Sequence, residues 1–196
     1  MRDGERDGER GATAIKLVAI VLGGALTLAA AGYSLALGRY QLDGPAMEPT
    51  FVHGDSAFVL KRWLAGAPRA GEVWILSSPA DGIEVVKRVI ATGGQTIEIR
   101  SDRLYIDGEP VPTERVDCPE TVRNPDGASC HRERIGERSW LTLTASYEVP
   151  DDLPPTELPE GCVFVLGDHR NRSNDSRNPH IGPICAGNHV GRVLVE

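Results

Sequence analysis

The chain has 196 residues, a net charge of −7, 5% aromatic residues and four cysteines. This length suits one domain with a sizeable core, or one domain with an inserted lobe. The negative charge argues against a nucleic-acid partner, which would call for clustered basic residues. The cysteines are too few for a disulfide scaffold, and the absence of a CxxC pair argues against a zinc site.

The first 38 residues divide into a charged tail and an apolar run. Residues 1–16 contain RDGERDGER, which cannot form a core, and we expect a cytoplasmic tail. Residues 17–38 carry no charge, and a transmembrane helix needs roughly 20 such apolar residues. A cleavable signal peptide is the alternative, because Ala29-Ala30-Ala31 resembles a cleavage site, but the apolar run continues to Leu37. Lys and Arg precede the run more often than they follow it, which predicts that residues 39–196 lie outside the cytoplasm.

The remainder of the chain is predicted to be an all-β domain. Short apolar runs alternate with Gly, Pro and Asp, and no long amphipathic helix appears. Asp107-Gly108 is a strong hairpin-turn signal. We expect packed antiparallel sheets or a partial barrel. The predicted strands are residues 56–60, 73–76, 84–91, 96–100, 104–106, 140–144, 163–166 and 190–195.

The stretch from about residue 113 to residue 160 is polar and Pro-rich, and we interpret it as an inserted lobe. Cys118 and Cys130 bracket the loop CPETVRNPDGASC within it. Outside the cytoplasm these cysteines are expected to form a disulfide, worth roughly 3 kcal/mol for a loop of this size. Two free surface thiols are the alternative. The sequence does not decide whether Cys162 pairs with Cys185.

A polar segment, GDHRNRSNDSRNPHIGP, follows the apolar run VFVL. Its residues are typical of a solvated loop. A calcium loop fails, because Asp168 is not followed by acids at alternate positions. A metal site on His169 and His180 lacks a third convincing ligand. A polar lining that orients a catalytic group is a further interpretation, and the sequence alone leaves these readings open.

Lys87 lies in the predicted strand 84–91, and strand alternation puts Lys87 and Arg88 on opposite faces. The strand is otherwise apolar, so at least one of these cations should meet apolar neighbours. Burial lowers the pKa of a lysine, and a neutral lysine amine is a general base. Burial statistics alone favour the alternative, a lysine that extends from an edge strand into water.

Residues 43–55 read DGPAMEPTFVHGD, a Gly- and Pro-punctuated loop suited to presenting a side chain, with Ala46 at its centre. Together with the segments above, this loop resembles the bacterial type I signal peptidases, which are membrane-anchored serine proteases of the Ser–Lys class. The family's nucleophile box, S-M-x-P-T, corresponds to residues 46–50, and its lysine box corresponds to residues 87–89. Its final box, G-D-N-R-x-x-S-x-D-S-R, corresponds to residues 167–177. The boxes occur in the family's order, and the resemblance covers residues 15–196.

The resemblance implies a role for each matched residue. Position 46 is the nucleophile's place, Lys87 is the general base, and Ser173 orients the lysine amine by a hydrogen bond. The N–H of residue 46 forms part of the oxyanion hole, which Gly44 flanks. Salt-bridged support for the site is expected from Arg88, Asp168, Asp175 and Arg177. Candidates for the substrate pocket are Met47, Phe51 and Val52, for which burial in the core is an equal alternative.

The resemblance also implies substrates, partners and a location. The substrates are secreted preproteins with small residues at −1 and −3 of the cut, bound through their signal peptides. Membrane lipid and the secretion translocon are the other implied partners, and no cofactor or metal is implied. The protein is expected in the bacterial inner (cytoplasmic) membrane, as a single-pass protein with its catalytic domain on the extracytoplasmic face.

Two departures from the family pattern matter. Gln95 stands where many members have an acid, and Ala46 cannot attack a carbonyl, so the chain as written should lack covalent catalysis. Deliberate substitution is the favoured explanation, because Lys87 and Ser173 survive. A natural pseudoenzyme that binds signal peptides without cleavage is the alternative. A conjugation-type maturation protease is a third interpretation, whereas self-cleaving repressors share the chemistry but lack a membrane span.

Overall fold

The structure, a computed structural model, describes residues 20–27, 32, 36–122, 127–144 and 152–194. The chain divides into two compact units, Met1–Gly38 and Arg39–Glu196. Residues 20–27 of the first unit are helical. Among the described residues, no helix is both long enough and apolar enough to span a membrane. The predicted tail and part of the predicted anchor lie outside the described residues, so the anchor stays a prediction.

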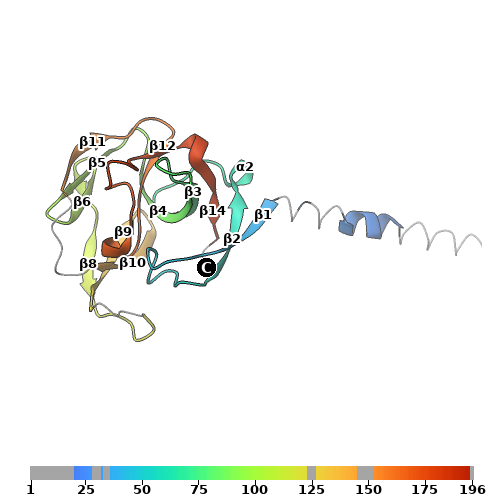
Figure 1. The fold of residues 1–196 in the computed structure, drawn as a ribbon, viewed down its shortest axis with the longest axis horizontal. Coiled ribbons are helices and arrows are strands. Elements are labelled where there is room, and N and C mark those ends of the chain that lie inside the picture. Colours follow the sequence, from blue (N-terminus) through green and yellow to red (C-terminus); the bar gives the residue numbers. More distant parts are fainter. Residues whose placement is uncertain (1–19, 28–31, 33–35, 123–126, 145–151, 195–196) are drawn as a thin grey trace, which may run out of the picture. The chain divides into compact units, whose positions relative to one another are not determined.

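The second unit is built from strands, which form three sheets within the described residues (Figure 1). The seven-stranded sheet has the order β1-β2-β14-β3-β4-β12-β13. Its strands are β1 (Leu37–Gln41), β2 (Ser56–Lys61), β14 (His189–Val193), β3 (Val73–Ser77), β4 (Glu84–Thr92), β12 (Cys162–Leu166) and β13 (Ile184–Cys185). The four-stranded sheet contains β11 (Leu153–Glu157), β5 (Thr96–Arg100), β6 (Arg103–Ile106) and β7 (Glu109–Pro110), in that order.

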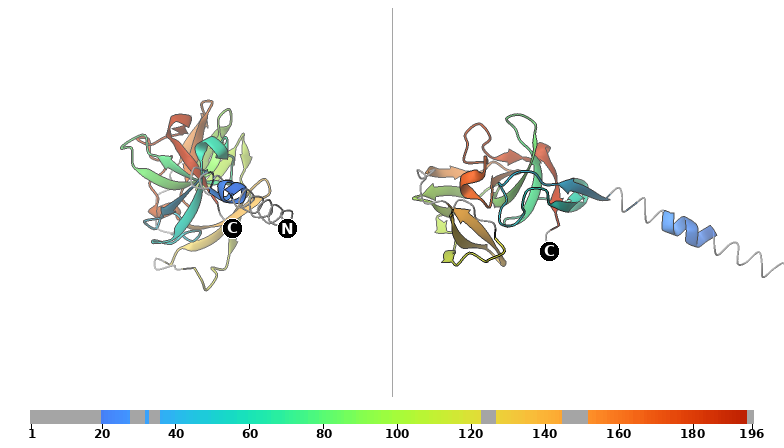
Figure 2. Two further views of the ribbon diagram at one scale, coloured as in Figure 1. Left: turned by 90° about the vertical axis from the view of Figure 1, so that its right-hand side faces the viewer. Right: turned by 60° about the horizontal axis from the view of Figure 1, so that its bottom comes forward.

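The third sheet has the order β10-β9-β8, with β8 at Thr113–Val116, β9 at Ser129–Ile135 and β10 at Arg138–Thr144. The right-hand view of Figure 2 shows it in yellow to orange at the lower left of the β domain. Short helices complete the described part of this unit: α2 (Arg62–Ala65), η1 (Arg170–Arg172) and η2 (Ala186–Asn188).

The all-β prediction is confirmed. Each of the eight predicted strands occurs, with ends that differ by at most two residues. The ladders from β2 onward are antiparallel. The turn signal Asp107-Gly108 joins β6 to β7, and both residues have positive φ, 53° and 81°, as a type I′ turn requires.

The segment interpreted as an inserted lobe contains four strands that the sequence pattern did not all reveal. β8, β9 and β10 form their own sheet, whereas β11 pairs with β5 at the edge of the four-stranded sheet. β11 contains two prolines, which an edge strand tolerates because its free edge needs no donor. The Cys118–Cys130 disulfide is present, as predicted. A second disulfide joins Cys162 and Cys185, which face each other across β12 and β13.

The core covers both faces of β4. On one face of the strand, Val89 packs with Trp74 and Val165. On the other face, Val86 packs against the cluster that contains Met47 and Ile75. A further cluster, which joins β4, β12, β5, β6 and β10, contains Ile90, Ile97, Leu104, Trp140, Phe164 and Leu166. Since apolar side chains cover both faces, each of the two cations of β4 becomes buried, and Lys87 and Arg88 are each only 5% exposed.

The Cys162–Cys185 disulfide links the two ends of the segment that contains the final sequence box. We expect the double variant Cys162→Ala/Cys185→Ala to unfold with a free energy lower by roughly 3 kcal/mol, because its unfolded chain is no longer cross-linked. Urea unfolding of the oxidised proteins measures the difference, which should shrink when both are reduced. Equal unfolding midpoints for the two oxidised proteins would contradict this expectation.

Candidate active site

The loop of residues 43–55 connects β1 to β2 and brings Ala46 against the polar loop that follows β12. The carbonyl of Ala46 accepts a hydrogen bond from the N–H of His169, at 3.1 Å. Gly44 has a φ of +87°, which favours glycine, and its N–H donates to Nδ1 of His53 at 3.1 Å. These contacts hold the predicted nucleophile position at the boundary between the two loops.

Gly167 lies where the two loops meet. A side chain at this position would collide with both the Ala46 carbonyl oxygen and the Ser173 hydroxyl. Glycine therefore allows the loops that carry Ala46 and Ser173 to approach each other. The Ser173 hydroxyl is buried and makes no hydrogen bond within the described part of the chain. The hydrogen bond predicted between Ser173 and the Lys87 amine is thus not formed in this structure.

Lys87 occupies an interior strand of the seven-stranded sheet, directly opposite Trp74 of β3. Because it is buried, the alternative of a lysine that extends into water is wrong. Burial lowers the pKa of Lys87 and Arg177 lowers it further, while the carboxylates of Asp175 and Asp168 oppose them without restoring the ordinary value. A lowered pKa leaves more of the amine neutral near pH 7, as a general base requires.

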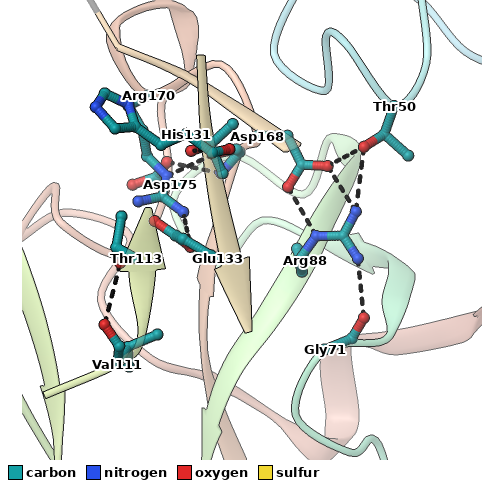
Figure 3. A network of polar contacts seen from close by, with 12 residues as sticks. Thr50, Gly71, Arg88, Val111, Thr113, His131, Glu133, Asp168, Arg170 and Asp175 are labelled. Atoms are coloured by element: carbon teal, nitrogen blue, oxygen red, sulfur yellow. Dashed lines mark hydrogen bonds and ion pairs between the residues drawn. The ribbon is translucent and has the colours of Figure 1, made fainter. Parts of the chain in front are cut away.

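Arg88 forms the centre of a buried polar network (Figure 3). Its guanidinium donates to both carboxylate oxygens of Asp168, with Nε to Oδ1 at 2.7 Å and Nη2 to Oδ2 at 2.6 Å. Nη1 donates to the carbonyl of Gly71 at 2.9 Å, and Nη2 to the Thr50 hydroxyl at 3.2 Å. The guanidinium carbon lies 4.6 Å from the centroid of Trp140. This network joins the loop of residues 43–55 to the start of the final box.

Asp175 and Arg177 form the second ion pair of the predicted support. Arg177 Nε donates to Oδ1 of Asp175 at 2.8 Å, and Nη2 donates to Oδ2 at 3.0 Å. The same Oδ2 accepts from the N–H of Gly167 at 3.0 Å. The acid–arginine set named from the sequence therefore pairs as Arg88–Asp168 and Arg177–Asp175.

The three pocket candidates differ in exposure. Met47 is 2% exposed and lies in the core cluster of β2 and β3, with no surface free for a peptide in this structure. Phe51 packs against the same cluster but is only partly buried, and Val52 is half-buried. Phe51 and Val52 therefore remain the candidates that a substrate could touch.

Some supporting residues were not predicted. Thr50 donates a hydrogen bond to Asp168, and its place in the nucleophile box was the signal that could have found it. Trp140 belongs to β10, and nothing in its local sequence pointed to the site. Within the part of the chain that the structure describes, no group of three His, Cys, Asp or Glu side chains could hold a metal ion.

Residues 14–196 match the family described as signal peptidase, peptidase S26, and the chain belongs to this family. Over 141 residues it is 34% identical to signal peptidase I of Bacillus licheniformis, covering 71% of this chain and 65% of that protein. It is 30% identical over 168 residues to signal peptidase I U of Bacillus subtilis (strain 168), covering 83% and 79%. A crystal structure of a signal peptidase I from Enterococcus faecalis is 28% identical, with a TM-score of 0.39, and covers 66% of this chain and 97% of that one. The chain thus spans slightly less than two thirds of the length of the first of these relatives.

Proposed function

We propose that this protein is a signal peptidase I, an endopeptidase that removes signal peptides from secreted preproteins after small residues. Family membership supports the class of substrate. The observation that carries the chemistry is the buried Lys87 with its lowered pKa, on a strand that also supplies Arg88 to the Asp168 pair. A buried lysine is rare in a protein core unless it is paired or functional, and a general base needs an environment that lowers its pKa.

The proposed mechanism uses a serine at position 46. The neutral amine of Lys87 takes the hydroxyl proton, and the serine oxygen attacks the scissile carbonyl. The N–H of residue 46 donates to the resulting oxyanion, as the family's hole does. Lys87 then gives the proton to the leaving amine, and water hydrolyses the acyl-enzyme with Lys87 again as base. Ser173 would orient the amine during these transfers.

With Ala46 the same site lacks a proton-bearing nucleophile, so the chain as written should bind a signal peptide without cutting it. Deliberate substitution remains our preferred explanation, since both ion pairs of the support are formed. Gln95 is also well accommodated. Its Oε1 accepts from Thr92 N–H at 3.0 Å and its Nε2 donates to Asp107 at 3.2 Å, a bond that a carboxylate could not donate. The residue at position 95 differs from the family pattern, but the structure accommodates it with hydrogen bonds. Gln95 is therefore weak evidence for the pseudoenzyme alternative.

We further propose that residues 17–38 anchor the protein in the bacterial inner membrane, with residues 1–16 in the cytoplasm and residues 39–196 outside. The two disulfides support an oxidising compartment. Exposed apolar side chains on β2 and α2, namely Phe58, Trp63 and Leu64, support contact with membrane lipid. The secretion translocon is a further proposed partner, because it delivers the preprotein substrates.

This topology has a direct test. Protease added to spheroplasts should digest residues 39–196 and leave a short fragment that contains the tail. A cytoplasmic protein in the same spheroplasts should survive until detergent is added. Protection of the β domain in intact spheroplasts would overturn the proposed orientation. The conjugation-type maturation alternative is tested separately, by offering the reverted enzyme a secreted preprotein as its substrate.

A further inference from the structure

We propose that Glu133, on β9 of the three-stranded sheet, is a positioning residue for the active-site loop and acts through Arg170. The inference deepens the proposed function and rests on it. The segment that contains Glu133 was interpreted above only as an inserted lobe, and the structure connects that lobe to the residues around the nucleophile position.

The contact between the two side chains is close and buried. Arg170 Nη2 donates to Oε2 of Glu133 at 2.5 Å, and the two side chains are 12% and 4% exposed (Figure 3). Burial by itself disfavours the charge of the guanidinium. The carboxylates of Glu133, Asp168 and Asp175 more than offset this effect and raise the pKa of Arg170. Arg170 therefore stays charged and depends on Glu133 as its nearest counterion.

Arg170 contacts the Gly167 carbonyl directly and is linked to the Gly167 N–H through Arg177 and Asp175. Its Nε donates to the Gly167 carbonyl at 3.2 Å. Its own carbonyl accepts from Arg177 Nη2 at 2.5 Å, and Arg177 pairs with Asp175, which accepts from the Gly167 N–H. Gly167 is the residue against which the Ala46 carbonyl and the Ser173 hydroxyl both lie. A shift of Arg170 should therefore displace Ser173 relative to position 46.

The same sheet reaches the site at two further points. Trp140 is the register partner of Glu133 on β10 and lies against the Arg88 guanidinium. Leu143 N–H donates to the Asp168 carbonyl at 2.9 Å, so the backbone of β10 also meets the loop. The sheet thus supports both ion pairs, Arg88–Asp168 through Trp140 and Arg177–Asp175 through the Glu133–Arg170 contact.

Loss of the Glu133 charge should change the protonation equilibrium of the Lys87 amine. Among the described residues, Arg170 pairs with Glu133, and His131 interacts with both. Arg103 and Arg115 line the same cavity as Glu133. Asp168, Asp175 and Arg177 act on Lys87. Without Glu133 the guanidinium of Arg170 has only Asp168 and Asp175 as counterions, and both of these carboxylates favour the charged form of Lys87. The variant Glu133→Gln should consequently ease deprotonation of Lys87.

The first test uses the chain as it exists. It contains three lysines, Lys16, Lys61 and Lys87, so ¹³C-labelled lysine yields few NMR signals to assign. In Glu133→Gln the titration midpoint of Lys87 should fall by about 0.5 pH or more, while that of Lys61 stays unchanged. Glu114→Gln, an exposed acid of β8 in the same sheet, should leave both midpoints unchanged. Glu133→Asp should keep the Lys87 midpoint, because it keeps the charge.

The second test uses cleavage of a preprotein in the Ala46→Ser background. Both Glu133→Gln and Glu133→Asp should lower kcat about 10- to 100-fold with KM nearly unchanged, because misplacement by about 1 Å has effects of this size. Glu114→Gln should retain the parental kcat. An unchanged Lys87 midpoint in folded Glu133→Gln, or parental kcat in both Glu133 variants, would overturn the inference. If Ala46→Ser itself does not cleave, the proposed function fails, and the Lys87 midpoint alone decides the role of Glu133.

Discussion

Purified Ala46→Ser protein should cleave a preprotein after a small residue, whereas the chain as written should bind the signal peptide and leave it intact. The reason is that the buried Lys87 amine can activate only a nucleophile that carries a proton. Cleavage is measured by gel and mass spectrometry of the product, and binding by the fluorescence anisotropy of a labelled signal peptide. Absence of cleavage by a correctly folded Ala46→Ser protein would favour the pseudoenzyme interpretation.

The same variant tests the base. Adding Lys87→Ala should reduce the rate by about 10²- to 10⁴-fold with little loss of binding, the range that general base catalysis contributes. Lys87→Arg should fail as well, because arginine does not lose its proton. Lys61→Ala is the matched control, since Lys61 lies at the exposed end of β2. Cleavage that persists without Lys87 would refute the Ser–Lys mechanism.

The rate of Ala46→Ser should rise with pH, because only the neutral amine of Lys87 accepts a proton. Its midpoint should lie below the ordinary pKa of lysine, since burial lowers the pKa in the folded protein. The same shift makes the folded state bind fewer protons than the unfolded state between the two pKa values. Lys87 therefore lowers stability at neutral pH, and this penalty disappears as pH rises toward the unfolded value.

The second large effect is expected at the buried ion pair. Asp168→Ala should lower the free energy of unfolding by about 3–5 kcal/mol, because it leaves the Arg88 guanidinium buried without its carboxylate. This is a large share of the roughly 5–15 kcal/mol that stabilises an ordinary domain. Urea unfolding followed by circular dichroism measures the change.

A matched control for this effect is Glu98→Ala. Glu98 lies 3.6 Å from Arg100, whose side chain is 59% exposed, and such a pair is worth about 0–1 kcal/mol. If Asp168→Ala destabilises the protein no more than Glu98→Ala does, the buried pair is not a main support of the site. In the double variant Asp168→Ala/Arg88→Met we expect partial recovery, because the uncompensated charge is gone.

Local sequence patterns were sufficient to predict much of the fold of this protein. Neighbouring residues alone were enough to predict the apolar strand β4, the alternating strand β5 and the Asp107-Gly108 turn. The structure confirms each of these elements. The sequence boxes around Ala46, Lys87 and Ser173 are local patterns too, and their resemblance to a known family indicated the candidate site before any geometry was known. The roles of these residues stay predictions. The Cys118–Cys130 bond was predictable because its two cysteines bracket one short loop.

Other features depend on which segments meet in three dimensions, and the sequence alone did not decide them. β9 reads SCHRERI, which has no apolar alternation, and it forms because β8 and β10 pair with it on both sides. The Cys162–Cys185 bond depends on the register of β12 and β13. Met47 could have faced a substrate, but packing places it in the core. Only the tertiary structure showed that Lys87 and Arg88 are both buried and that Glu133 contacts Arg170. The periodicity of a strand determines which face a side chain points to. The neighbours that pack against that face decide whether the side chain meets water or protein.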